Sequence, residues 1–233
     1  MLFKKEASKM GSSNHGWLQS RFHFSFADYY NPENMEFGVL RVLNDDIIAA
    51  NQGFDLHPHN DMEIITYVVN GELTHKDSLG NERTLTRGHV LAMSAGVGIE
   101  HSEYNHSDKD LRILQLWVKP NAPALKPHYN DFKYKWKLHA NAWHEIVSSE
   151  IGEAEVRINQ DISINILTLE AGNTEGYAVD SDRQAYLIQV EGSSRINDVQ
   201  MNQGDGLEII GEDLELTAST NSHFLLIEVP RVS

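Results

Sequence analysis

Two pairs of side chains that can bind metal stand out in the sequence, because the members of each pair are two residues apart. The first pair is His57 and His59, and the second is His101 and Glu103. In a β-strand, residues i and i+2 point to the same face, so each pair would present two ligand atoms to one side. On neighbouring strands, the pairs would supply three imidazoles and one carboxylate. Such a set suits one divalent transition metal, with positions left open for water, dioxygen or substrate.

The residues around these pairs indicate irregular backbone. Pro58, between the two histidines, cannot donate to a central ladder and favours an edge, a strand start or a bulge. Gly96 and Gly98 precede the second pair and predict a turn of unusual geometry. A lone H-x-H is more often a surface or satisfied polar pair, and the second pair makes the metal interpretation the stronger one.

Short strand-like runs bounded by turn residues recur along the chain, and helical periodicity is scarce. This pattern is typical of an all-β sandwich or barrel, because such strands alternate with tight turns. Representative runs are 37–44, 62–69, 89–95, 111–120 and 222–229. The sequence therefore predicts an antiparallel β-fold that would position the metal pairs.

The two halves of the chain resemble each other in layout. An apolar run ends at Gly71 in the first half and at Gly192 in the second, and a short strand follows each. Another glycine, Gly88 or Gly204, then opens the next apolar strand. The layout predicts two copies of one β-fold. Asn70-Gly71 between two strand-like runs is also the signal of a type I′ hairpin.

A linker is expected at 119–145, where three prolines precede a mixed aromatic and basic segment. We therefore predict an N-terminal metal-binding barrel over 1–130 and a C-terminal barrel over 131–233. The second half contains no H-x-H, so no metal is expected there.

Composition limits the function classes. The 233 residues carry a formal net charge of −15 and include no cysteine. The acidic surface disfavours direct binding of nucleic acid or anionic membranes. The absence of cysteine excludes disulfides and thiolate metal sites and fits a cytoplasmic location. No apolar run has the length of a membrane span, and the N-terminus lacks the apolar region of a signal peptide.

The metal segments carry a family resemblance. Residues 53–63 read G-x3-H-x-H-x3-E, close to the first cupin motif, and "GIEHSEYN" at 98–105 fits the second. Within the cupins, the chain resembles pirin-like proteins more closely. The segments that look like theirs are "NHGWLQSRFHFSFADYYNP", "HPHNDMEIITYVVNGELTHKDSLGN" and "MSAGVGIEHSEYN". The resemblance covers most of 10–120, and the second half matches only in layout.

This resemblance implies a bicupin, with two tandem antiparallel β-barrels of jelly-roll type joined by a short linker. It also implies a metal in the first barrel, held by His57, His59, His101 and Glu103. In germin-type cupins the carboxylate comes from the first motif, which is Glu63 here. Glu63 lies four residues beyond His59, roughly 13 Å along an ideal strand, so it is kept only as a residue that could support the ligands.

The resemblance further implies quercetin 2,3-dioxygenase activity on a small aromatic substrate, a flavonol, with O2. Fe(II) is the expected metal, while Zn, Mn, Ni, Co and Cu also suit the donor set. Glu103 would be a ligand and also the base that takes the substrate proton. The alternative is a non-enzymatic regulatory or redox-sensing protein that acts through protein partners.

The sequence gives weaker evidence of a functional role for other residues near the metal segments. His75 and His89 lie on strand-like runs and could reach the pocket, although such histidines are more often exposed or satisfied by a neighbour. His23, Trp117 and Met93 are candidates for the wall of a pocket for a flat substrate. Core packing explains Trp117 and Met93 equally well.

Overall fold

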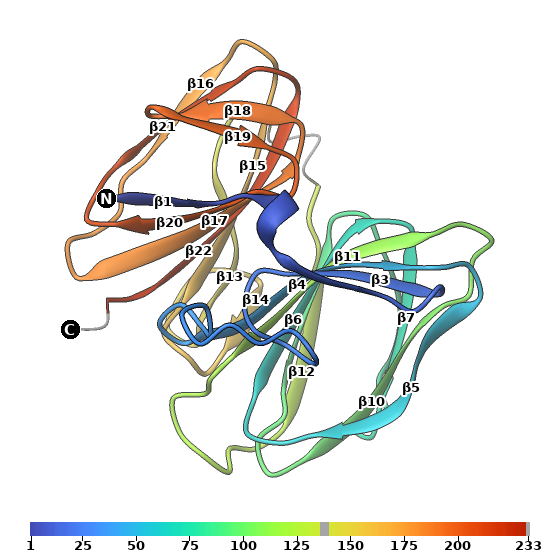
Figure 1. The fold of residues 1–233 in the computed structure, drawn as a ribbon. Helices are drawn as coiled ribbons and strands as arrows, with labels where there is room; N and C mark the ends of the chain where they lie inside the picture. Colours follow the sequence, from blue (N-terminus) through green and yellow to red (C-terminus); the bar gives the residue numbers. More distant parts are fainter. Residues whose placement is uncertain (136–139, 232–233) are drawn as a thin grey trace. The chain divides into compact units, whose positions relative to one another are not determined.

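The computed structural model describes residues 1–135 and 140–231. Within these ranges the chain is almost entirely β-strand, with one short 3-10 helix, η1 (Ala7–Lys9) (Figure 1). The prediction of an all-β fold is thus confirmed. No helix in the described part of the chain is long and apolar enough to span a membrane. The linker expected at 119–145 is wrong in part, because His128–Lys133 within it form a strand that pairs with the strand His89–Ser94. Residues 136–139 of this range lie outside the described residues.

The chain forms two compact units, which we call the N-terminal and the C-terminal barrel. The N-terminal barrel comprises Gly11–Tyr134 and Ser149–Gln160. The C-terminal barrel comprises Met1–Met10, Lys135–Ser148 and Asp161–Ser233. Each barrel therefore contains a segment that a simple division at 130/131 assigns to the other.

Strand pairing and hydrogen bonds explain these two exchanged segments. The first strand, β1 (Leu2–Lys5), pairs with β20 (Gly206–Ile210) and so belongs to the C-terminal barrel (Figure 1). In the segment 149–160, Arg157 N donates to Asn130 Oδ1 at 2.7 Å. Neither contact leaves a signal in local sequence, because each joins residues far apart in the chain.

The N-terminal barrel consists of two antiparallel sheets around an apolar core. The larger has the order β12-β9-β6-β11-β4-β3-β2, and the smaller has the order β5-β10-β7-β8. Their strands are β2 (Gly11–Asn14), β3 (Leu18–Phe22), β4 (Leu40–Ile48), β5 (Gln52–His59), β6 (Glu63–Asn70), β7 (Glu72–Asp77), β8 (Glu82–Thr86), β9 (His89–Ser94), β10 (Ile99–Asn105), β11 (Leu111–Val118) and β12 (His128–Lys133). The short strand β14 (Val156–Ile158) also belongs to this unit.

The C-terminal barrel repeats this arrangement. Its strands besides β1 and β20 are β13 (His144–Ser149), β15 (Ser163–Leu169), β16 (Thr174–Tyr177), β17 (Arg183–Glu191), β18 (Ser193–Ile196), β19 (Val199–Asn202), β21 (Leu214–Ala218) and β22 (Ser222–Pro230). The order β20-β17-β22-β15 matches β9-β6-β11-β4, and β16-β21-β18-β19 matches β5-β10-β7-β8. The prediction of two copies of one fold is confirmed. The counterpart of β10 is β21, whose Leu214, Leu216 and Ala218 are buried in the core.

The hairpin predicted at Asn70-Gly71 is wrong. Strands β6 and β7 lie in different sheets, so Gly71 carries the chain from one sheet to the other. Only Gly71 has a positive φ, at 89°, whereas a type I′ turn requires one at both central residues. A Cβ on Gly71 would lie 2.8 Å from the backbone oxygen of Asp110. Glycine is favoured at this position for two reasons: the backbone φ is positive, and the backbone of Asp110 leaves no room for a Cβ.

We expect Gly71→Ala to destabilise the fold more than Gly80→Ala, which provides a matched control. Gly80 has a similar φ of 92°, but a Cβ there would meet no atom within 4 Å. The backbone strain shared by both variants costs about 1–2 kcal/mol, and the clash at Gly71 adds to it. Denaturant unfolding of both variants measures the difference, and equal losses would show that the close approach carries no cost.

Candidate metal centre

The two predicted pairs lie on adjacent strands. His57 and His59 are on β5, and His101 and Glu103 are on its antiparallel neighbour β10. His101 lies opposite His57, and a register shift follows between His101 and Glu103. One ring nitrogen each of His57, His59 and His101 lie within 4.8 Å of one another. The ring centroids of His57 and His101 are 4.4 Å apart, so the three imidazoles form one cluster.

Glu103 belongs to a second cluster that shares His101. One of its carboxylate oxygens lies within 4.8 Å of ring nitrogens of His101 and His75. Thr66 Oγ1 donates to Glu103 Oε1 at 3.1 Å, and Gln115 Nε2 donates to Oε2 at 2.6 Å. Each oxygen keeps a further lone pair, so the carboxylate is oriented without losing its capacity to bind a cation.

Trp117 connects the histidine cluster with the carboxylate. Its ring centroid is 5.1 Å from that of His59, at an interplanar angle of 83°. Its indole Nε1 donates to Gln115 Oε1 at 3.4 Å, which leaves the NH2 group of the Gln115 amide turned toward Glu103. Trp117 therefore borders the cluster, whereas Met93 is fully buried in the apolar core and His23 is fully buried.

Burial and the neighbouring rings lower the pKa of His59 and of His101, which keeps these two imidazoles neutral. Burial lowers the pKa of His59 to about 4, and the nearby rings of His101 and His57 contribute. Burial likewise lowers the pKa of His101 to about 3, with contributions from His57 and His75. A neutral imidazole keeps a lone pair on one nitrogen, which is the form that binds a metal.

The residues present fit a bound cation. Both ring nitrogens of His101 are buried without a hydrogen-bond partner among the described residues. An unpaired buried polar atom is costly, and a metal ion at one of these nitrogens would satisfy it. The Nδ1 of His57 donates to the backbone oxygen of Asp55 at 2.7 Å, because a carbonyl can only accept. That bond leaves the Nε2 lone pair of His57 available.

The cluster is reachable from one side. His57 and His59 are half-buried, while His101 and Glu103 are each 1% exposed. A cavity of about 550 Å³ includes His59 of the cluster in its lining, and its other lining residues are Pro58, Asn60, Ser78, Gly98, Ile99 and Glu100. This volume lies in the usual range of small-molecule sites.

Glu63 is not placed beside the histidines. Thr66 on β6 points toward the site, because its hydroxyl donates to Glu103. Glu63 lies three residues before Thr66 on the same strand, so its side chain points to the opposite face. Its Oε1 accepts hydrogen bonds from Asn159 Nδ2 at 2.8 Å and from Ser94 Oγ at 3.3 Å. His89, the first residue of β9, forms a local contact instead. Its Nδ1 lies within hydrogen-bond distance of the backbone of Thr86, the last residue of β8.

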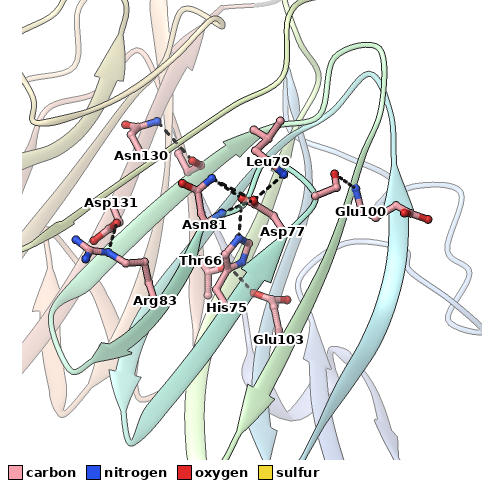
Figure 2. A network of polar contacts seen from close by, with 12 residues as sticks. Thr66, His75, Asp77, Leu79, Asn81, Arg83, Glu100, Glu103, Asn130 and Asp131 are labelled. Carbon is pink, nitrogen blue, oxygen red and sulfur yellow. Dashed lines mark hydrogen bonds and ion pairs between the residues drawn. The ribbon is translucent and has the colours of Figure 1, made fainter.

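His75 lies closer to the metal cluster than its sequence context indicated, since a ring nitrogen of His75 lies within 4.8 Å of ligand atoms of His101 and Glu103. It is fully buried, and the register of β7 places it opposite Glu103 (Figure 2). Its Nε2 contacts Asp77 Oδ2 at 3.3 Å, so one of its nitrogens is satisfied by a neighbour as expected. A usable signal was present, because His75 and Asp77 have the same i, i+2 spacing as His101 and Glu103.

A further buried carboxyl, Asp46 on β4, was not singled out from the sequence. It lies opposite Ile113 of the core cluster and is 3% exposed. Burial raises the pKa of Asp46 to about 7; a hydrogen bond with Ser20 opposes the shift, and the charges of Asp45 and Glu103 add to it. Asp46 is therefore protonated in the folded protein at mildly acidic pH.

We expect Asp46→Asn to stabilise the metal-free protein at pH 8 and to change little at pH 5. The folded pKa lies above the unfolded one, so the folded state binds more protons and loses stability as pH rises from about 4 to about 7. Each pH unit in that window corresponds to about 1.4 kcal/mol. Urea unfolding of both proteins at the two pH values measures the gain, and an equal effect at pH 5 and 8 would contradict it.

The chain is similar to known proteins over its whole length. A family model described as Pirin matches residues 4–118, and one described as Quercetinase C-terminal cupin domain matches residues 145–229. A Pirin-like protein of Caulobacter vibrioides is 40% identical, over 98% of this chain and 99% of its own. Quercetin 2,3-dioxygenase of Escherichia coli K12 is 36% identical, over all of both chains. The structure of the bacterial pirin YhhW from Escherichia coli, in complex with nickel(II), matches with a TM-score of 0.93 and 36% identity over both entire chains.

Proposed function

The chain belongs to the pirin family of cupin proteins, and on this basis we propose that it is a metal-dependent dioxygenase that cleaves flavonols such as quercetin with O2. The observation that carries the proposal is that ring nitrogens of three histidines converge within 4.8 Å of one another, with Glu103 beside His101. Two of these histidines, His57 and His59, are only half-buried, whereas His101 and Glu103 are buried. A metal held there would be open to a small molecule on one side and enclosed by protein on the other.

In this proposal one divalent metal is held by His57, His59, His101 and Glu103. When bound, the metal would supply Lewis acidity toward a flavonol hydroxyl and the chemistry of dioxygen. We propose Fe(II) as the physiological metal. The nickel(II) of the Escherichia coli pirin supports the view that such a donor set accepts several late transition metals.

The residues of the chain would contribute binding, orientation and proton transfer. Glu103 would take the proton of the substrate hydroxyl, because it is a carboxylate beside His101 with lone pairs to spare. Thr66 and Gln115 hold that carboxylate through one hydrogen bond to each oxygen. The ring of Trp117, next to His59, offers an apolar surface for a flat aromatic substrate.

The test is turnover by the purified protein after it is stripped of metal and reloaded separately with Fe(II), Mn(II), Ni(II), Co(II), Cu(II) and Zn(II). Loss of quercetin absorbance and O2 uptake are followed together. The proposal predicts metal-dependent loss of quercetin with a matched uptake of O2.

Tight metal binding without quercetin turnover, whichever metal is loaded, would contradict the dioxygenase proposal. It would favour the regulatory alternative, in which the metal acts as a structural or redox switch toward a protein partner. Fe(II) as the metal and the cytoplasm as the location stay predictions in either case.

A further inference from the structure

His101 has a second ring nitrogen, which would not bind the proposed metal. A histidine that binds metal through one nitrogen usually donates a hydrogen bond from the other, and this bond fixes the tautomer and orients the ring. For His57 the partner is the backbone oxygen of Asp55, at 2.7 Å. His101 has no such partner, because both of its nitrogens are buried and unpaired among the described residues.

The pair formed by His75 and Asp77 provides an acceptor. Asp77 Oδ1 accepts from the backbone N–H groups of Leu79 and Asn81, and the Asn81 side chain donates to both carboxylate oxygens (Figure 2). So many donors require an ionised carboxylate. A carboxylate can only accept, so His75 Nε2 must carry the proton that faces Asp77 Oδ2. In the neutral ring, Nδ1 then carries a lone pair.

The strands bring the ring of His75 close to the ring of His101. Across β7 and β10, His101 lies opposite Asp77, and His75 lies opposite Glu103. The ring centroids of His75 and His101 are 5.4 Å apart, and a nitrogen of each lies within 4.8 Å of the other. The Nδ1 of His75 is itself buried without a partner. His75 also stacks on Tyr129, with ring centroids 4.9 Å apart, which limits its rotation.

We propose that Asp77, His75 and His101 form a hydrogen-bond relay that orients His101 toward the metal. In this relay Asp77 accepts from His75 Nε2–H, and His75 Nδ1 accepts from the N–H of His101 that does not face the metal. Within the described part of the chain, the structure records no hydrogen bond at His75 Nδ1 or at either nitrogen of His101, so the relay requires the two rings to turn toward each other. The inference rests on the proposed metal site and deepens it. His75 and Asp77 are positioning residues, since they act through His101.

Glu103 is a poorer partner for His75. Both of its oxygens already accept hydrogen bonds, from Thr66 and from Gln115. A carboxylate is also an acceptor, and it gains nothing from the lone pair of His75 Nδ1. The N–H of His101 is the donor that this lone pair can use. The relay thus satisfies two buried nitrogens with one bond.

The test uses Asp77→Asn in the full chain, because an asparagine can still accept from the turn at Leu79 and Asn81 while presenting N–H groups to His75. That change reverses the tautomer of His75, so Nδ1 becomes a donor that opposes the N–H of His101. We expect the affinity for Co(II), measured by competition with a chelating dye, to fall about 10- to 100-fold. Nitrogen-15 NMR of the metal-free protein should show His75 protonated at Nε2 in the wild type and at Nδ1 in the variant.

Several results would overturn the relay. One is a reversed tautomer with unchanged Co(II) affinity, and another is a wild-type His75 protonated at Nδ1 or at both nitrogens. If wild-type protein binds no Co(II), the proposed metal site itself fails, which is a different outcome from a wild type that binds and a variant that binds equally well.

A second variant covers the case in which Asp77→Asn does not fold. His75→Phe keeps the stack on Tyr129 but removes both nitrogens, and the same 10- to 100-fold loss of Co(II) affinity is expected. Complete loss of binding, as for a missing ligand, would mean that His75 binds the metal directly and would overturn the relay. Glu82→Gln serves as the control, because Glu82 is exposed on β8 and pairs only with Lys76 among the ion pairs of the described residues.

Discussion

Metal binding is expected to be lost when His101 is replaced by alanine. His101 is common to both clusters, and its nitrogens have no other partner among the described residues. Changes to residues that merely support a metal ligand cost about 10- to 100-fold in affinity, so loss of this ligand should exceed 100-fold. Flavonol turnover should fall to background with it. Metal content after dialysis and turnover on quercetin measure the two effects.

The variant should remain folded, which keeps this test interpretable. Removing a buried ring with unpaired nitrogens removes a cost as well as packing contacts. His106→Ala is the matched control, because His106 is exposed and stacks on Tyr104 just beyond the end of β10. A His101→Ala protein that keeps one tightly bound metal would show that the cluster is not the metal site.

Replacing Glu103 by glutamine is expected to separate metal binding from catalysis. The amide is nearly isosteric with the carboxylate, and its oxygen can still accept from Gln115 while its NH2 group faces the hydroxyl of Thr66. Loss of the negative charge should weaken metal affinity. Loss of the base should lower turnover by about 100- to 10,000-fold even in metal-saturated protein.

Saturation with metal distinguishes the two roles of Glu103. Turnover of the Glu103→Gln protein is measured at increasing Fe(II) until it no longer rises, and the plateau is compared with that of the wild type. A plateau equal to the wild type would eliminate the base role and leave Glu103 as a ligand alone. The introduced glutamine can still contact both partners, because its oxygen accepts from Gln115 and its NH2 group can donate to the Thr66 hydroxyl. Thermal unfolding of the variant checks that it is folded.

The fold could be predicted from sequence because its signals are local. Short apolar runs between turn residues indicated an all-β chain, and the matched glycines indicated a repeat. Both were confirmed by the equivalent sheet orders of the two barrels. The hairpin at Asn70-Gly71 failed because tertiary packing against Asp110 determines the path of the chain there. The exchange of β1 depended on pairing with a strand about 200 residues away, which no local pattern encodes.

The ligand pairs of the candidate site could also be predicted from the sequence, because their signal is local. The i, i+2 spacing of His57 with His59 and of His101 with Glu103 is a local property, and the structure brings these strands together. The residues around them were harder to find. Gln115 and Thr66 have no distinctive spacing, and their contact with Glu103 depends on the approach of the two sheets.

The position of the bound metal tests the proposed site most directly. Crystals of protein loaded anaerobically with Fe(II) would be measured at the iron absorption edge for an anomalous difference map. A single peak is expected in the N-terminal barrel, within bonding distance of His57, His59, His101 and Glu103. No peak at this cluster in iron-loaded crystals, or a peak held by other residues, would contradict the proposed site.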